Sequence, residues 1–74
     1  MSPLSLNDIA IGLPARIKEL RAEPAVCQRL REMGFCEFAE VYKLAQSEAL
    51  ICRVCGGKVA LSERLAKNIL VEIL

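Results

Sequence analysis

The apolar residues of this 74-residue chain come in short segments separated by turn-forming residues, and this spacing limits what the chain can fold into. The longest apolar run, with glycine and proline counted as apolar, covers residues 9–15, whereas a membrane-spanning helix needs about 20 apolar residues. The N-terminus has no basic region, and Asp8 and Pro14 lie where a signal peptide would be uniformly apolar. We therefore expect a cytoplasmic protein without direct membrane insertion, folded as a single domain over residues 1–74.

Residues 24–33 are predicted to form the main helix. Proline suits the first helical position, because its missing N–H would be unpaired there in any case. Apolar side chains recur at helical spacing along one stripe, made by Val26, Leu30 and Met33, with Cys27 beside it. Gly34 follows directly, as expected for a residue that ends a helix in the left-handed conformation.

Most of the other apolar segments have the length of β-strands. Gly56 and Gly57 predict a hairpin turn, and Ser62 predicts the N-cap of a short helix over residues 63–67. A helical turn capped by Ser5 or Asn7 is expected within residues 4–14. The predicted strands cover residues 15–20, 38–44, 49–54, 59–61 and 69–74. About five short strands, one well-defined helix and one or two short helical turns indicate a mainly β fold, a small and partly closed barrel.

The composition argues against an enzyme. The chain has no histidine, so the side chain that most often serves as general base near neutral pH is absent. Its four glycines match neither a dinucleotide-binding fingerprint nor a phosphate-binding loop. We therefore predict no catalytic residues.

The charge balance argues against nucleic-acid binding. The formal net charge is only +1, and three aromatic side chains are available to stack on bases. Nucleic-acid-binding domains usually carry a strongly basic face. The charged residues are therefore interpreted as a mixed, solvated surface.

Two motifs, in this order and spacing, resemble a known family. The first is Arg-Leu-Arg-Glu-Met-Gly-Phe at residues 29–35, and the second is Val-Cys-Gly-Gly-Lys-Val-Ala-Leu at residues 54–61. Together with Val41, Ala66, Ile69 and Val71, they resemble FeoA-type ferrous iron transport proteins over nearly the whole chain. The resemblance implies an SH3-like β-barrel and a small cytoplasmic partner of FeoB, a membrane protein with a G-protein domain that takes up ferrous iron. It also implies kinship with the C-terminal SH3-like domain of some metal-dependent repressors.

The chain departs from the family pattern at two turns and one helix start. Family members commonly continue Gly-Phe with x-Pro-Gly, whereas Cys36, Glu37 and Phe38 stand here. The loop at residues 45–48 lacks the proline and glycine that are often found there. Ser62 replaces an arginine that tends to follow the Ala-Leu pair. These departures are consistent with a divergent member or with altered binding.

The four cysteines leave alternatives open. Cys52 and Cys55 have the C-x-x-C-G form of a metal knuckle, and they are the candidate ligands of zinc or ferrous iron. Cys27 and Cys36 would have to complete a four-thiolate site, although their spacing is not that of a knuckle. Ligation by the first pair requires the chain to turn before Cys55, because strand positions i and i+3 point to opposite faces. Three interpretations therefore stay open. Buried structural cysteines are the favoured one, metal ligation is the second, and redox or disulfide chemistry is the third.

These observations favour a protein-interaction module, docked on the G-protein domain of a FeoB-type membrane GTPase. Phe38, Tyr42 and Leu50 are candidate contacts, although a core position is favoured for Phe38. The alternatives are a cysteine-based module that binds or senses a transition metal, and a relative of the repressor domain. Glu37, Glu40 and Glu48 offer oxygen atoms to a ferrous ion, but a solvated face is the favoured interpretation of these carboxylates.

Overall fold

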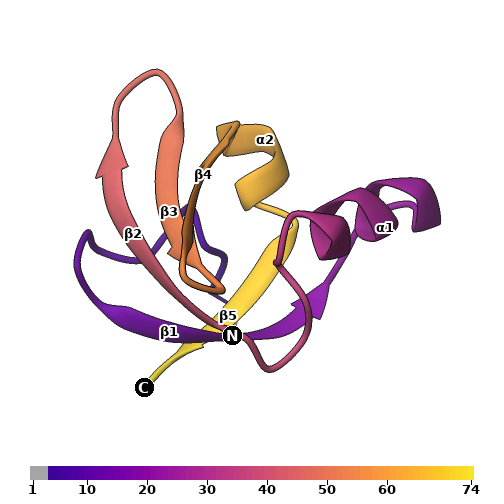
Figure 1. Cartoon of the computed structure of the whole chain (residues 1–74), viewed down its shortest axis with the longest axis horizontal. Helices are drawn as coiled ribbons and strands as arrows, with labels where there is room; N and C mark the ends of the chain where they lie inside the picture. Colours follow the sequence, from indigo (N-terminus) through magenta and orange to yellow (C-terminus); the bar gives the residue numbers. More distant parts are fainter. Residues whose placement is uncertain (1–3) are drawn as a thin grey trace.

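The computed structural model, which describes residues 4–74, contains a five-stranded antiparallel sheet and two helices (Figure 1). The strands are β1 (Pro14–Leu20), β2 (Glu40–Gln46), β3 (Leu50–Val54), β4 (Gly57–Leu61) and β5 (Ile69–Ile73). The helices are α1 (Pro24–Glu32) and α2 (Glu63–Ala66). The strand order is β4-β3-β2-β1-β5. The predicted mainly β, SH3-like fold is confirmed, and no helix within residues 4–74 is long and apolar enough to cross a membrane.

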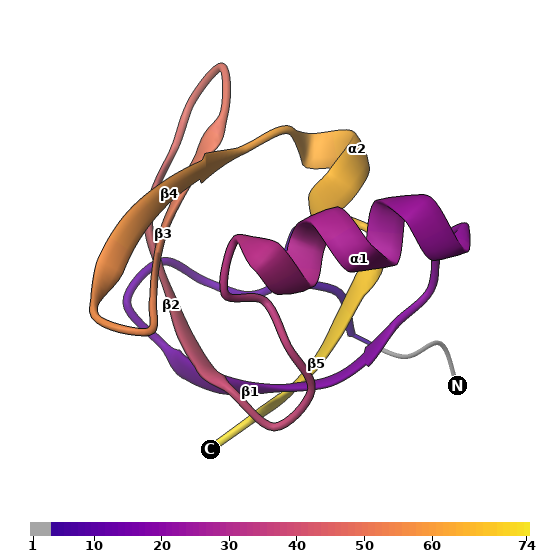
Figure 2. The ribbon, with the colours of Figure 1, turned by 45° about the vertical axis from the view of Figure 1, so that its right-hand side comes forward.

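Two register irregularities bend the sheet. One lies between Ile17 and Glu19 where β1 pairs with β5, and the other lies between Lys43 and Ala45 where β2 pairs with β3. An extra residue in one strand bends it and increases its twist. The sheet therefore curls, and α1 lies across its open side (Figure 2).

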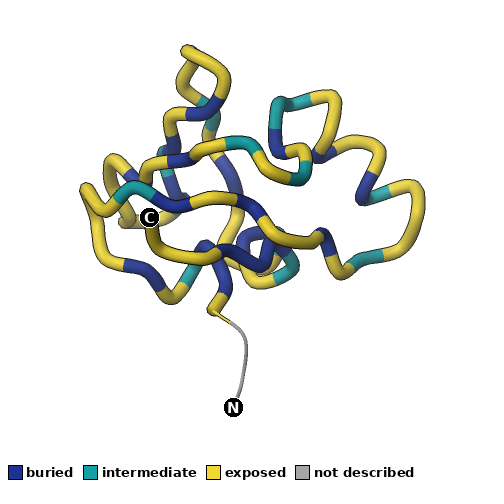
Figure 3. The backbone as a smooth tube through the Cα atoms, turned by 90° about the horizontal axis from the view of Figure 1, so that it is seen from below, coloured by how far each residue is buried: buried dark blue, intermediate teal, exposed yellow. Residues whose placement is uncertain are grey.

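The core fills the space between the curled sheet and α1. Buried and exposed residues alternate along much of the strands, as Figure 3 shows by colour. The residues with no exposed surface come from β1, β2, β3, β5, α2 and the segments before β1 and after α1. They include Leu6, Ile17, Phe35, Val41, Leu50, Cys52, Ala66 and Ile69.

The N-terminal segment is joined to strand β5 by backbone hydrogen bonds. Leu6 N–H donates to Ile69 O at 2.8 Å, and Val71 N–H donates to Leu4 O at 2.9 Å. The turn that follows is not capped as expected from Ser5 or Asn7. Instead, the Asp8 carboxylate accepts from Ser5 N–H at 3.1 Å and from the Ser5 hydroxyl at 3.0 Å, which lowers the Asp8 pKa.

Helix α1 begins and ends as its sequence predicts. Pro24 occupies the first turn, Cys27 and Leu30 are buried, and Gly34 has a φ of +103°. The short helix α2 is capped by the Ser62 hydroxyl, which accepts from Leu65 N–H at 3.2 Å. Strand β2 begins at Glu40 and not at the predicted residue 38, because Phe38 has a φ of +72°, which no β-strand residue adopts.

Gly34 gives a first testable prediction. A Cβ atom at Gly34 would already be in van der Waals contact, 3.4 Å from Val54 Cγ1 and 3.5 Å from Cys55 Sγ, so the γ-methyl groups of a valine would crowd these side chains, while Gly12 (φ +89°) has open space around it. Gly34→Val should therefore lower the free energy of unfolding by about 3 kcal/mol, through both backbone strain and crowding. Gly12→Val, which meets strain alone, should cost about 1–2 kcal/mol. Urea denaturation measures both, and equal losses would contradict the crowding at Gly34.

Candidate functional site

A tight turn between α1 and β2 presents Phe38 to solvent. The turn is closed by Ala39 N–H, which donates to Cys36 O at 3.1 Å. It is fixed to β1 by two further bonds, from Phe38 N–H to Ile17 O at 2.7 Å and from Ile17 N–H to Ala39 O at 2.9 Å. Phe38 is 78% exposed, so the interpretation that favoured a core position for this residue is wrong. The backbone is thus firmly held while the ring stays in water.

A shallow hollow lies directly after this turn. It has a volume of about 340 Å³ and lies between the start of β2 and the turn that joins β3 to β4. Tyr42 lines this hollow and is 37% exposed. Leu50 is fully buried, so the prediction that it is a contact residue is wrong. The hollow is lined by Ala39, Glu40, Tyr42, Arg53, Val54, Cys55 and Gly56. We call Phe38 together with these lining residues the turn face.

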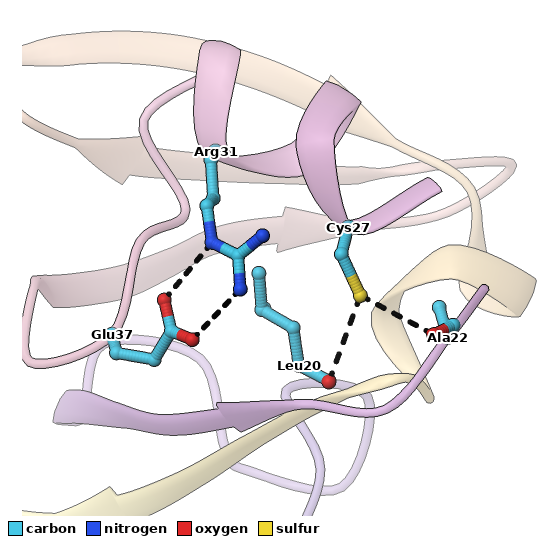
Figure 4. Close-up of polar contacts among 5 residues, drawn as sticks. All are labelled: Leu20, Ala22, Cys27, Arg31 and Glu37. Carbon is cyan, nitrogen blue, oxygen red and sulfur yellow. Dashed lines mark hydrogen bonds and ion pairs between the residues drawn. The ribbon is translucent and has the colours of Figure 1, made fainter. Parts of the chain in front are cut away.

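Charges on and beside the turn face are of both signs. Glu40 and Arg53 line the hollow. Next to it, Arg31 of α1 pairs with Glu37, with Nη2 to Oε2 at 3.0 Å and Nε to Oε1 at 3.2 Å (Figure 4). This bidentate contact lowers the pKa of the Glu37 carboxyl and raises that of Arg31. Because the pair is exposed, we expect it to orient the turn more than to stabilise the fold.

The carboxylates predicted as ferrous ligands do not gather into a site. Glu37 is engaged by Arg31, Glu40 lines the hollow, and Glu48 lies in the turn between β2 and β3. Within residues 4–74, no three histidine, cysteine, aspartate or glutamate side chains are grouped so that they could hold a metal ion. The favoured interpretation of these carboxylates, a solvated surface, agrees with this arrangement.

The cysteines divide into a buried and an exposed pair. Cys27 packs in the core, with Sγ 3.4 Å from Ala22 O and 3.7 Å from Leu20 O (Figure 4). Cys52 is fully buried in β3, and burial raises the pKa of its thiol. Cys36 and Cys55 are exposed. The favoured structural role fits the buried pair only.

The predicted metal ligands Cys52 and Cys55 have different surroundings. Cys52 points into the core, whereas Cys55 has a φ of +52° and begins the turn after β3 at the surface. A buried thiol with a raised pKa resists forming the thiolate that zinc binds. The buried thiol of Cys52 is therefore the less favourable ligand of the predicted pair, and Cys55 lies beside Cys36, since both sulfurs contact Gly34 O.

Comparison with known proteins identifies the family. The FeoA domain model matches residues 4–73. This chain belongs to the FeoA domain family. Its structure is similar to iron(II) transport protein A from Clostridium thermocellum, with 27% identity and a TM-score of 0.91. That comparison covers 96% of this chain and 46% of the other, so the chain spans about half the length of that relative.

Two further solved structures share the fold of this FeoA domain. Stenotrophomonas maltophilia FeoA, a prokaryotic SH3 domain protein complexed with zinc, is 28% identical with a TM-score of 0.83, covering 93% of this chain and 89% of that one. A manganese-dependent transcriptional repressor shares the fold at a TM-score of 0.89 and 18% identity, covering 100% of this chain and 38% of the repressor. No curated protein matches the chain in sequence.

The family pattern explains the turn at Phe38. In Gly-Phe-x-Pro-Gly, the last glycine falls at the position of Phe38, where the backbone φ is +72°. A type II turn needs positive φ at its third residue, and glycine adopts it without strain. This FeoA domain keeps the turn but places an aromatic residue in it, at a cost of about 1–2 kcal/mol. Backbone geometry therefore does not account for an aromatic residue at this position.

Lys43 is a buried residue that sequence reasoning overlooked. Only 1% of it is exposed, and its Nζ donates to Asn7 O at 3.0 Å, Ile9 O at 2.7 Å and Gln46 Oε1 at 2.9 Å. The Gln46 amide in turn donates to Asn7 Oδ1 and to Glu63 Oε1. The alternation of buried and exposed residues along a strand could have indicated its burial, because Lys43 follows buried Val41 by two positions in β2. In this FeoA domain, one ammonium group ties the N-terminal turn to the sheet.

Proposed function

We propose that this chain, acting as a single FeoA-like domain over residues 1–74, is a cytoplasmic accessory protein of ferrous iron uptake. It docks on the G-protein domain of a FeoB-type membrane transporter and modulates it, without a reaction of its own. Family membership supports the link to iron transport. The observation that carries docking is the turn face, where a strained backbone holds the exposed aromatic residue Phe38 directly before Ala39, which lines the hollow.

The chemistry of the turn face suits a protein partner. Aromatic side chains have few rotatable bonds, so they lose little conformational entropy on binding, and they often dominate the binding energy of an interface. Tyr42 adds a second ring with a polar tip, and Glu40 and Arg53 supply charges of both signs. Such a mixed surface fits a patch of similar size on a folded domain better than a uniformly charged polymer.

A direct binding measurement tests this proposal. The purified chain is titrated into the isolated G-protein domain of the FeoB-type transporter from the same genome, and binding is followed by calorimetry. We expect saturable one-to-one binding and none to an unrelated small GTPase domain. Ferrous iron uptake is measured in parallel in a strain that lacks the gene, and we expect it to change. Absence of binding together with unchanged uptake would refute the proposal.

A metal-binding role is the second candidate, because the Stenotrophomonas maltophilia FeoA is complexed with zinc. Here Cys52 and Cys55 are the predicted ligands. Elemental analysis of chain purified without tags or chelators tests the prediction: stoichiometric zinc or iron that is lost in the Cys52→Ser, Cys55→Ser double variant would support it. Folded, metal-free wild-type chain would exclude it. A further alternative is that the chain acts with a metal-dependent repressor, and this alternative is supported only by the shared fold. A repressor gene beside the gene for this chain would favour it.

A further inference from the structure

Cys36 and Cys55 meet at one carbonyl oxygen. Cys36 Sγ lies 3.9 Å from Gly34 O, and Cys55 Sγ lies 3.6 Å from the same atom. The two sulfurs are therefore no farther apart than these two distances added together. Both cysteines are exposed, so a reagent in water reaches either of them.

The fold brings the two cysteines together from different turns. Cys36 follows the end of α1, and Cys55 begins the turn between β3 and β4. The two turns pack closely at Gly34, where a Cβ atom would be in van der Waals contact with Cys55 Sγ at 3.5 Å. Cys36 lies two residues after Gly34, outside regular secondary structure, and Gly56 and Gly57 follow Cys55. Both cysteines thus lie outside the helices and strands.

The other two thiols are protected. Cys52 has no exposed surface, and burial raises the pKa of its thiol, which lowers its reactivity. Cys27 is buried with its sulfur against Ala22 O and Leu20 O. Oxidation of the folded protein should therefore select the exposed pair.

We propose that Cys36 and Cys55 form a reversible intramolecular disulfide when the protein meets a peroxide. One thiol attacks the peroxide, which yields a sulfenic acid and one water molecule. The second thiol then displaces the hydroxyl group from that sulfur, so that the S–S bond forms and a second water molecule leaves. The two cysteines lose two electrons and two protons, and the peroxide O–O bond is reduced.

A metal ion fits this pair less well than a disulfide does. Structural zinc sites use four protein ligands, and catalytic ones use three. Within residues 4–74, no third histidine, cysteine, aspartate or glutamate joins the pair in a metal-holding group. Two sulfurs without further donors suit a covalent bond between them.

The disulfide would tie the end of α1 to the turn between β3 and β4. It closes a loop of about 20 residues, which restricts the unfolded chain. We expect the midpoint of thermal unfolding to rise by about 10 °C on oxidation and to fall back on addition of dithiothreitol. The bond would also alter the rim of the hollow, which Cys55 and Gly56 line.

Mass spectrometry of the full chain tests the proposal. Reduced protein is treated with hydrogen peroxide at equimolar concentration and digested with trypsin without reduction. Cleavage after Arg29, Arg31, Lys43 and Arg53 places each cysteine in a separate peptide; with the flanking cuts after Arg21 and Lys58, these peptides are residues 22–29, 32–43, 44–53 and 54–58. The expected product is the 32–43 peptide joined to the 54–58 peptide, with the intact chain lighter by two hydrogen atoms.

Three variants make the result decisive. Cys36→Ser and Cys55→Ser change exposed side chains and should fold, but they should lose both the link and the rise in melting temperature. Cys27→Ala should keep both. A link between the 44–53 and 54–58 peptides would overturn the proposal, as would only intermolecular dimers or only sulfinic acid. An unchanged melting temperature despite the Cys36–Cys55 link would overturn the expected tying of the two turns.

Discussion

Replacing Phe38 with alanine is expected to weaken binding to the G-protein domain by about 30-fold or more, with little change in stability. The ring is 78% exposed, so it contributes little to folding, while an anchored aromatic side chain typically contributes about 2 kcal/mol or more to an interface. Calorimetric titration of the transporter domain measures the loss. Ile11→Ala is the matched control, since it removes an exposed apolar side chain from the loop before β1 and should leave affinity unchanged.

Replacing Phe38 with glycine separates function from stability. Glycine adopts a φ near +72° without strain, so Phe38→Gly should raise the free energy of unfolding by about 1 kcal/mol and the melting temperature by about 5 °C. Binding should fall as far as in Phe38→Ala. A glycine variant that is less stable than the wild type would show that the ring supports the fold. Full affinity in both variants would remove Phe38 from the proposed interface.

Replacing Lys43 with methionine is expected to lower the free energy of unfolding by about 2–3 kcal/mol. Methionine fills a similar volume but leaves Asn7 O, Ile9 O and Gln46 Oε1 without their donor. Denaturation in urea measures the loss, and Lys18→Met, at an exposed position of β1, should change stability by less than about 0.5 kcal/mol. A neutral or stabilising Lys43→Met would mean that the cost of burying the ammonium equals or exceeds the gain from its three bonds.

The pH dependence of this variant has a definite sign. Burial lowers the pKa of Lys43, although Cys52, Asp8 and Glu63 partly oppose the shift. Between the lowered pKa and the unfolded value near 10.4, the unfolded chain binds more protons than the folded one, so stability rises with pH. The stability difference between wild type and Lys43→Met should therefore widen as pH rises through this window. A difference that narrows would indicate that the three carbonyl contacts raise the pKa instead.

Local signals predicted most of the fold. Pro24 and Gly34 mark the ends of α1 through their backbone conformations, and Ser62 caps α2 through its hydroxyl, so each acts on its near neighbours in sequence. The double glycine marked the β3–β4 hairpin only in part, because Cys55 and Gly56 form the turn and Gly57 already begins β4. The prediction failed at Phe38, where strand propensity gave way to a turn held by bonds to Ile17 in β1. The amino-acid pattern of residues 36–40 gives no sign of this partner, because Ile17 lies in a different strand, far away in sequence.

The candidate site was only partly predictable for the same reason. Phe38 and Tyr42 could be named as contacts from their residue types, but their exposure depends on how the sheet curls. The juxtaposition of Cys36 and Cys55 depends on two turns that pack through Gly34 O, and motif spacing favoured Cys52 and Cys55 instead. Lys43 is buried because its acceptors come from the N-terminal turn, far away in sequence.

The two edges of the sheet differ in a way that bears on handling the protein at high concentration. The backbone of residues 4–6 covers the outer side of β5, through bonds to Ile69 and Val71. Strand β4 pairs only with β3 among the residues that the structure describes. An uncovered strand is a template for a second molecule, and a lysine on it discourages such growth. Lys58 lies exposed in β4, so acetylating or replacing this side chain would remove a charge that discourages pairing at this edge.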